Sequence, residues 1–210
     1  MKKYVVAFML VIGMVMFASF AFCENMTPEQ MVEKIHWLGQ ATVKIEAGDK
    51  VIYLDPFKIE KADKADVILI THSHQDHFSP DDLAKVATEK TVFIAPKDCA
   101  AAIEAKFKTK VTIAEPGMNT KVGDVQIEAV PAYNVVKVKN HPKENKWVGY
   151  VLTIDGVRIY HAGDTERIPE MKTFACDIAM LPLGQTYTMN NVQEAVDAAL
   201  DVKAKIAIPI

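Results

Sequence analysis

The stretch 66-DVILITHSHQDHFSP-80 joins an apolar run to a loop rich in histidine. Residues 66–70 form a short continuous apolar segment, which is typical of a buried β-strand. Ser79 and Pro80, followed by two aspartates, are typical of the first turn of an α-helix. The stretch therefore predicts a strand, a polar loop and a helix, which is the repeating unit of an α/β fold.

The loop itself indicates metal binding. Only six histidines occur in the 210 residues, and three of them fall within six consecutive positions here. In an extended segment, His72 and His74 point the same way and can converge on one ion. Asp76 and His77 follow in the turn and are available for a second ion. Imidazole and carboxylate groups without a thiolate suit zinc first, and iron or manganese next.

A second candidate lies in 160-YHAGDTE-166. An apolar strand runs into a glycine turn that presents Asp164, and a carboxylate at this point could bridge two ions. The alternative is an ordinary turn aspartate. Because one loop cannot complete two coordination spheres, we interpret Asp164 as a ligand supplied from later in the chain.

The rest of the chain alternates strands and helices without a repeat or a linker. A short helix capped by Thr27 is expected within residues 26–39. Two segments, 115–124 and 133–146, are expected as loops. Two sheets flanked by helices are the simplest packing for this order of elements. Strands are expected at 41–48, 49–55, 91–95, 110–114, 125–130, 147–154, 157–162, 176–183 and 205–210, and further helices at 79–90, 97–107 and 190–202.

The N-terminus has the pattern of a secretory signal peptide. Lys2 and Lys3 precede the uncharged segment 4–22, which ends in small residues. We expect a signal peptide over 1–23, a functional domain over 24–210, and export to the periplasm or the extracellular space. Two alternatives are an uncleaved membrane anchor, since the apolar run is nearly long enough to span a bilayer, and a lipoprotein acylated at Cys23.

Charge and cysteine content narrow the function further. The formal net charge is −3, and it becomes −5 without the two N-terminal lysines. A mildly acidic chain argues against nucleic acid as a partner. Cys99 and Cys176 have no metal-ligand spacing. They could form one disulfide in an oxidising compartment, but we interpret them as small core residues.

Taken together, these motifs resemble the metallo-β-lactamase superfamily of metal-dependent hydrolases. More narrowly, the chain looks like the branch of stand-alone hydrolases that includes L-ascorbate-6-phosphate lactonase. The resemblance covers nearly everything after residue 34 and implies an αββα four-layer sandwich with the metals at one edge, between the sheets. It extends over HWLGQATVKIE, VIYLDPF, ADVILITHSHQDHFSP, VPAYN, HPKENKWVGYVLTIDGVRIYHAGDTERIPEM, LPLGQTYTMNNVQEA and KIAIPI.

The resemblance also implies roles for individual residues. The first ligand motif is matched by His72, His74, Asp76 and His77. Asp164 matches the bridging aspartate, where the class B1 β-lactamases have a cysteine, so an antibiotic-destroying activity of that kind is not expected. Asp55 matches the acidic residue that supports the histidine loop.

Two departures from the superfamily pattern stand out. Asn134 occupies the usual place of the third-motif histidine, and some relatives carry a histidine shortly afterwards. His141 is therefore a candidate ligand or substrate contact, with a surface-loop histidine as the alternative. Relatives also continue after Ile-Pro with a final metal-binding histidine, whereas this sequence stops at Ile210. We expect either a fragment that lacks its C-terminal end or a second metal that lacks one ligand.

The function expected from the resemblance is zinc-dependent hydrolysis of an ester, lactone or phosphoester of a small molecule. Two zinc ions would supply a hydroxide at neutral pH, and Asp76 would be the catalytic residue that orients it. The alternative is a catalytically impaired metal-binding protein of the same fold. His161 is expected to be a buried support. Further residues expected near the site are Thr165, Glu166, Tyr187 and Asn190, and four loop lysines at 137, 139, 143 and 146 could attract an anionic substrate or be solvated surface.

Overall fold

The computed structural model describes residues 26–184 and 186–210, which form two six-stranded sheets. The first sheet contains its strands in chain order, and β3 to β6 run parallel. The second has the order β12-β11-β10-β9-β8-β7, with β10 to β12 parallel. The strands of the first sheet are β1 (Ile35–Gly39), β2 (Thr42–Ala47), β3 (Lys50–Leu54), β4 (Val67–Leu69), β5 (Val92–Ala95) and β6 (Val111–Ile113). Those of the second are β7 (Asn119–Val122), β8 (Val125–Pro131), β9 (Val148–Ile154), β10 (Val157–His161), β11 (Ile178–Leu181) and β12 (Ile206–Pro209).

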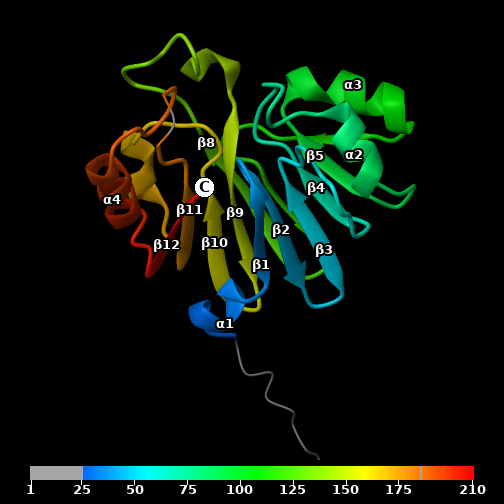
Figure 1. The fold of residues 1–210 in the computed structure, drawn as a ribbon, viewed down its shortest axis with the longest axis horizontal. Helices are drawn as coiled ribbons and strands as arrows, with labels where there is room; N and C mark the ends of the chain where they lie inside the picture. The colour runs from blue at the N-terminus through cyan, green and yellow to red at the C-terminus, as the bar shows by residue number, and fades with distance from the viewer. Residues whose placement is uncertain (1–25, 185) are drawn as a thin grey trace, which may run out of the picture.

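Helices cover the outer faces of both sheets. In Figure 1, α2 (Pro80–Val86) and α3 (Lys97–Phe107) lie on one side of the molecule and α4 (Val192–Asp201) lies on the other. A fourth helix, α1 (Pro28–Val32), precedes β1, and short 3-10 turns occur at Lys143–Asn145 and Pro169–Thr173. The expected αββα sandwich is confirmed.

The N-terminal segment expected as a signal peptide lies outside the described residues. Within residues 26–184 and 186–210, no helix combines the length and the apolar character that crossing a membrane requires.

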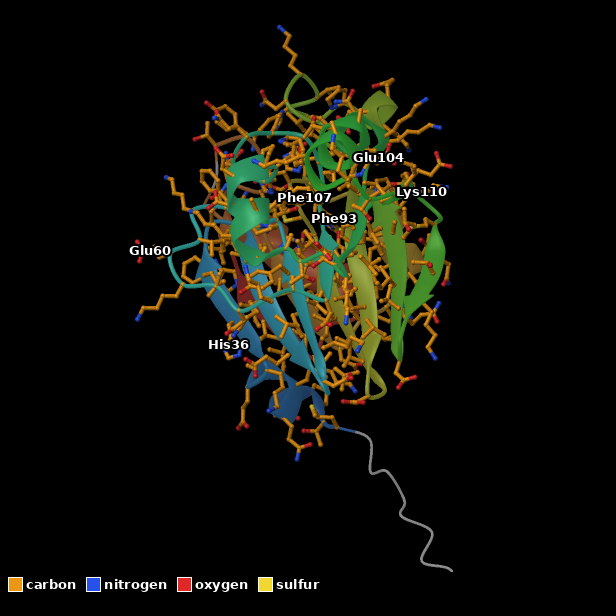
Figure 2. The ribbon with its side chains drawn as sticks, turned by 90° about the vertical axis from the view of Figure 1, so that its right-hand side faces the viewer. His36, Glu60, Phe93, Glu104, Phe107 and Lys110 are labelled. Carbon is orange, nitrogen blue, oxygen red and sulfur yellow. The ribbon has the colours of Figure 1, made fainter. Side chains whose placement is uncertain are left out.

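The main core lies between the two sheets. It is built from side chains such as Ile45, Leu69, Ile127 and Leu152, all buried to 1% exposure or less. Burying one such side chain contributes roughly 1.5–3 kcal/mol. Smaller clusters lie beneath the outer helices, and Figure 2 shows Phe93 of β5 beside Phe107 of α3, with ring centroids 4.9 Å apart.

The short helix expected within residues 26–39 is confirmed as Pro28–Val32, and Ile35–Gly39 pairs with β2. Two other predicted boundaries were wrong. Residues 119–122, expected within a loop, form edge strand β7, whose polar residues lack the alternation that marks a strand. The helix expected over 79–90 ends at Val86, because Ala87 adopts an extended backbone. Cys99 and Cys176 are free and buried, so the core interpretation holds.

Polar ties join the two sheets at the end that carries the histidine loop. The Tyr150 hydroxyl donates to the Ile70 carbonyl at 2.7 Å, and the Val148 amide donates to the Thr71 carbonyl at 3.2 Å. A further contact joins the end of β10 to the turn between β1 and β2, where the His161 Nε2 lies 2.8 Å from the Ala41 carbonyl oxygen. These bonds fix the start of the histidine loop, at the end of β4, relative to β9 and β10.

Candidate metal centre

A buried carboxylate at the end of β3 organises the histidine loop. Asp55 is fully buried and has a left-handed backbone conformation (φ 45°). Its Oδ1 accepts a hydrogen bond from the Thr71 amide at 2.7 Å, and its Oδ2 accepts one from the Thr71 hydroxyl at 2.6 Å. The same Oδ2 lies 2.8 Å from His77 Nδ1. Through these contacts, Asp55 supports the histidine loop, as the resemblance implies.

These contacts determine which histidine nitrogens are free. Because His77 Nδ1 donates to a carboxylate, Nε2 is the nitrogen left to face a metal, and a metal bound there would take the place of the Nε2 proton. The Thr71 hydroxyl donates its proton to Asp55, so it accepts from His72 Nδ1, 2.9 Å away. His72 therefore presents a lone pair at Nε2. Both rings are oriented as metal ligands require.

Four side chains converge on one point between the sheets. His72, His74, His141 and Asp164 each offer one ligand atom, and these atoms all lie within 4.8 Å of one another. His72 Nε2 and His74 Nδ1 are 3.1 Å apart. His141, from the loop between β8 and β9, lies with its ring centroid 5.0 Å from that of His72. Three separate segments thus supply one set of donors.

Asp164 connects this set with His77. One carboxylate oxygen, Oδ2, lies 3.3 Å from His141 Nε2, and the other, Oδ1, lies 3.3 Å from His77 Nε2. The backbone makes this position possible through Gly163 (φ 60°), where an added Cβ would lie only 2.9 Å from the Thr71 Cβ. Asp164 therefore has the placement expected of a carboxylate shared by two neighbouring ions.

Asp76 lies at the exposed rim of the centre. Its Oδ2 is 3.9 Å from His77 Nε2 and accepts a hydrogen bond from the Gln40 amide at 2.8 Å. The side chain is 48% exposed, unlike the buried His77. Gln40, in the turn between β1 and β2, has no motif that marks it in the sequence.

Burial and charge set the protonation of the centre. Burial is the largest influence on the pKa values of His72 and His74, and it lowers both, which favours the neutral imidazole that binds metal. For His77, burial lowers the pKa, but the neighbouring Asp55 and Asp164 outweigh it and raise the pKa to about 10. For Asp164, burial raises the pKa of the carboxyl, but the nearby His141 and His77 rings outweigh it and hold that pKa well below its usual range.

The donor set fits a divalent metal. His77 Nε2 and Asp164 Oδ1 are buried, and among the described residues neither has a hydrogen-bond partner. Buried polar atoms normally have one, so these two atoms face a place where a cation would satisfy them. Nitrogen and carboxylate oxygen donors without a thiolate match zinc.

An aromatic wall closes one side of the centre. The ring of Trp147 packs against His72, His74 and His141 at centroid distances of 5.0, 4.8 and 5.4 Å. The Trp147 indole donates to Asp98 Oδ2 at 2.9 Å, which fixes its orientation. A cavity of about 850 Å³ begins at this wall and another of about 480 Å³ at Asp76.

Several predicted residues lie beside the metal donors rather than among them. The side-chain NH₂ group of Asn134 donates to the carbonyls of Lys137 and Tyr187. His161 is the buried support expected, because its Nε2 is bonded to Ala41 and its Nδ1 accepts from the Gly163 amide. Asn190 is exposed and outside the donor set.

The loop lysines are largely committed to other contacts. Lys137 pairs with Glu166 at 3.7 Å and also donates to the Thr188 carbonyl. Lys143 pairs with Glu170 at 2.7 Å. Lys146 lies 3.5 Å from a glutamate carboxylate, so three of the four loop lysines already face a carboxylate, and Lys139 is exposed.

Residues 34–210 match the family described as a β-lactamase superfamily domain. The chain belongs to this superfamily. Two curated relatives, both named UPF0173 metal-dependent hydrolases, come from Pyrococcus furiosus (38% identical, 84% of this chain and 83% of the relative) and Geobacillus sp. WCH70 (34%, 84% and 84%). Among solved structures, a protein from Parabacteroides distasonis assigned as a metal-dependent hydrolase superimposes on this chain with a TM-score of 0.74. The two sequences are 36% identical, and the match covers 83% of this chain and 80% of the other.

Proposed function

We propose that this superfamily member is a zinc-dependent hydrolase that acts on an ester, lactone or phosphoester of a small molecule. The observation that carries the proposal is the Asp164 carboxylate. One of its oxygens faces the His72, His74 and His141 donor set and the other faces His77, so two metal positions share one residue. The relatives named as metal-dependent hydrolases support the same reaction class.

The chain's residues divide the work as follows. His72, His74, His141 and Asp164 would hold one ion, and Asp164, His77 and Asp76 a second. Bound zinc supplies a Lewis acid that polarises the substrate and lowers the pKa of water to about 7. Gln40 holds Asp76 through Oδ2, which leaves the other carboxylate oxygen to accept a proton from the attacking water. Asp55 keeps the histidine loop in place throughout.

The surroundings favour a small substrate. Cavities adjoin the centre at Trp147 and at Asp76. Trp147 offers an apolar surface beside the metal donors, and such a surface excludes water from the reacting bond. Lactones are the first substrates to test, because the sequence motifs resemble those of the ascorbate-phosphate lactonase branch. Export of the protein, directed by the apolar segment 4–22, belongs to this proposal.

A second function is favoured by one observation. Among the described residues, the His77 side of the centre has three candidate ligands, whereas the opposite side has four. A protein that binds a single ion and does not turn over substrate would fit this asymmetry.

Metal content and hydrolysis of a lactone, ester and phosphoester panel test the proposal together. The His74→Ala variant removes a donor, and His36→Ala is its control, because His36 pairs with Glu46 away from the centre. We expect two zinc ions and hydrolysis in the wild type and in His36→Ala, with both reduced in His74→Ala. One ion without turnover would favour the second function. A metal other than zinc in the wild type would correct only the identity of the metal in the proposal. No metal at all would overturn both.

A further inference from the structure

Glu166 is a buried carboxylate with no place among the metal donors. It follows Asp164 by two residues and is only 4% exposed. Its Oε2 accepts hydrogen bonds from the backbone amides of Val135 and Val136, at 2.8 and 2.6 Å. Its Oε1 accepts from the Lys137 amide at 3.3 Å. One side chain thus satisfies three consecutive backbone donors.

These amides belong to the loop that carries His141. The Val135 and Val136 side chains are 52% and 83% exposed, so no packing of these side chains holds this part of the loop. Loops without buried apolar contacts open readily. The Glu166 carboxylate is therefore the anchor of this part of the loop.

A chain of hydrogen bonds leads from this anchor to His141. The Asn134 side-chain amide donates to the Lys137 carbonyl at 3.1 Å, and the Asn134 backbone amide donates to the His141 carbonyl at 2.8 Å. The two ends of the loop are thereby tied together next to the residues that Glu166 holds. The position of His141 depends on these bonds.

Thr165, which lies between Asp164 and Glu166, adds further hydrogen bonds to the same loop. The Thr165 hydroxyl accepts from the Tyr133 amide at 3.2 Å and donates to the Tyr133 carbonyl at 2.8 Å, and the Glu166 amide also donates to that carbonyl at 3.2 Å. Asp164, Thr165 and Glu166 are consecutive. Their segment therefore supplies one candidate ligand and holds the loop that supplies another.

We propose that Glu166 is a positioning residue that holds His141 in the metal centre through the backbone of residues 134–137. The inference rests on the proposed metal-binding function and extends it to a residue outside the donor set. Glu166 itself lies outside the cluster of candidate metal donors. It sets the distance between His141 and Asp164, which is 3.3 Å between His141 Nε2 and Asp164 Oδ2.

The Glu166→Gln variant tests the proposal. It keeps the shape of the side chain but replaces one acceptor oxygen with an amide nitrogen, which cannot accept from the backbone. Groups that orient metal ligands typically contribute 10–100-fold to metal affinity. With Co²⁺ as the probe, we expect a 10–100-fold weaker affinity. We also expect a weaker d–d absorption band at saturating Co²⁺, because a displaced His141 changes the coordination.

Glu170→Gln is the matched control. Glu170 also contacts this loop, but only through the Tyr133 hydroxyl and Lys143, at 2.7 Å each, and it holds no loop amide. Its substitution should leave Co²⁺ affinity within about twofold of the wild type. If Glu166 only stabilised the fold, its variant would unfold more easily but would show an unchanged band at saturation, and that result would overturn the proposal.

Two further measurements cover other outcomes. If Glu166→Gln does not fold, Glu166→Asp takes its place, and wild-type affinity in that variant would overturn the proposal. In the metal-free wild type, the amides of residues 135–137 should be protected from hydrogen exchange, and rapid exchange there would also overturn it. A wild type that binds no Co²⁺ defeats the proposed function itself, whereas unchanged binding in a folded Glu166→Gln variant defeats only the role of Glu166.

Discussion

Replacing Asp55 with asparagine tests the hydrogen-bond network that sets the histidine tautomers. The wild-type carboxylate accepts from the Thr71 amide, the Thr71 hydroxyl and His77 Nδ1. Asparagine has one acceptor oxygen. If that oxygen stays with the Thr71 amide, the new NH₂ group faces His77 Nδ1 and cannot accept its proton. When metal binding leaves the His77 ring with one proton, that proton is then held on Nε2, the nitrogen that faces Asp164, and Nε2 is not available to the metal.

The magnitude follows from the contacts that are lost. A hydrogen bond to a charged group contributes about 1.5–3 kcal/mol, and the variant loses one or two of the three that the buried Asp55 accepts. We expect the free energy of unfolding of the metal-free protein to fall by roughly 1.5–6 kcal/mol. Metal affinity on the His77 side should fall by about 10–100-fold.

Urea unfolding and zinc titration of the same preparations provide the assay. Asp66→Asn is the control, because Asp66 begins the segment that leads into the histidine loop and accepts one amide hydrogen bond, from Val51, away from the centre. It should lose stability modestly and keep its zinc affinity. An Asp55→Asn protein that unfolds within about 1 kcal/mol of the wild type and binds zinc with wild-type affinity would refute the tautomer argument.

Three further predictions concern the frame around the centre. Gly163→Ala requires a positive φ from alanine and brings its Cβ to 2.9 Å from the Thr71 Cβ, so unfolding should become easier by roughly 2–5 kcal/mol and metal content should drop; retention of both would contradict the need for glycine. Tyr150→Phe removes the hydroxyl donor to the carbonyl at the end of β4 and should cost about 1–3 kcal/mol in a denaturant titration; a neutral result would mean that the tie between the sheets is weak. For Asp82, burial raises the pKa of the carboxyl, but hydrogen bonds from Lys85 and others outweigh it, and the pKa lies below the ordinary 3.8. Its contribution to stability is therefore present above pH 3.8 and is lost as the pH falls further, so Asp82→Asn should flatten the acid limb of a stability–pH curve below about pH 4; parallel curves would contradict this.

Local patterns predicted the parts of the fold that depend on neighbouring residues. The Thr27 cap, the buried strand before the histidine loop and the α3 helix all follow from short stretches of sequence, and the structure places each of them as expected. The edge strand β7 could not be predicted in the same way. Its polar residues become a strand only by pairing with β8.

The candidate site shows the same division. His72, His74 and Asp164 could be predicted, because a motif presents each of them at the end of a strand. Trp147 and Gln40 could not, since the sequence does not reveal which distant side chains their positions face. Their contacts with the histidine rings and with Asp76 arise when loops more than thirty residues away along the chain fold over the histidine loop.

Trp147, which forms the aromatic wall, can also serve as a fluorescence probe of the metal centre. Only two tryptophans occur in the chain, and Trp37 is 58% exposed, whereas Trp147 is 6% exposed and stacked among the candidate ligands. In a Trp37→Phe background, the tryptophan fluorescence, excited at wavelengths that tyrosine does not absorb, would come from Trp147 alone. A paramagnetic ion held by those histidines would quench that emission at short range. Occupancy of the centre could then be followed in real time, without knowledge of the substrate.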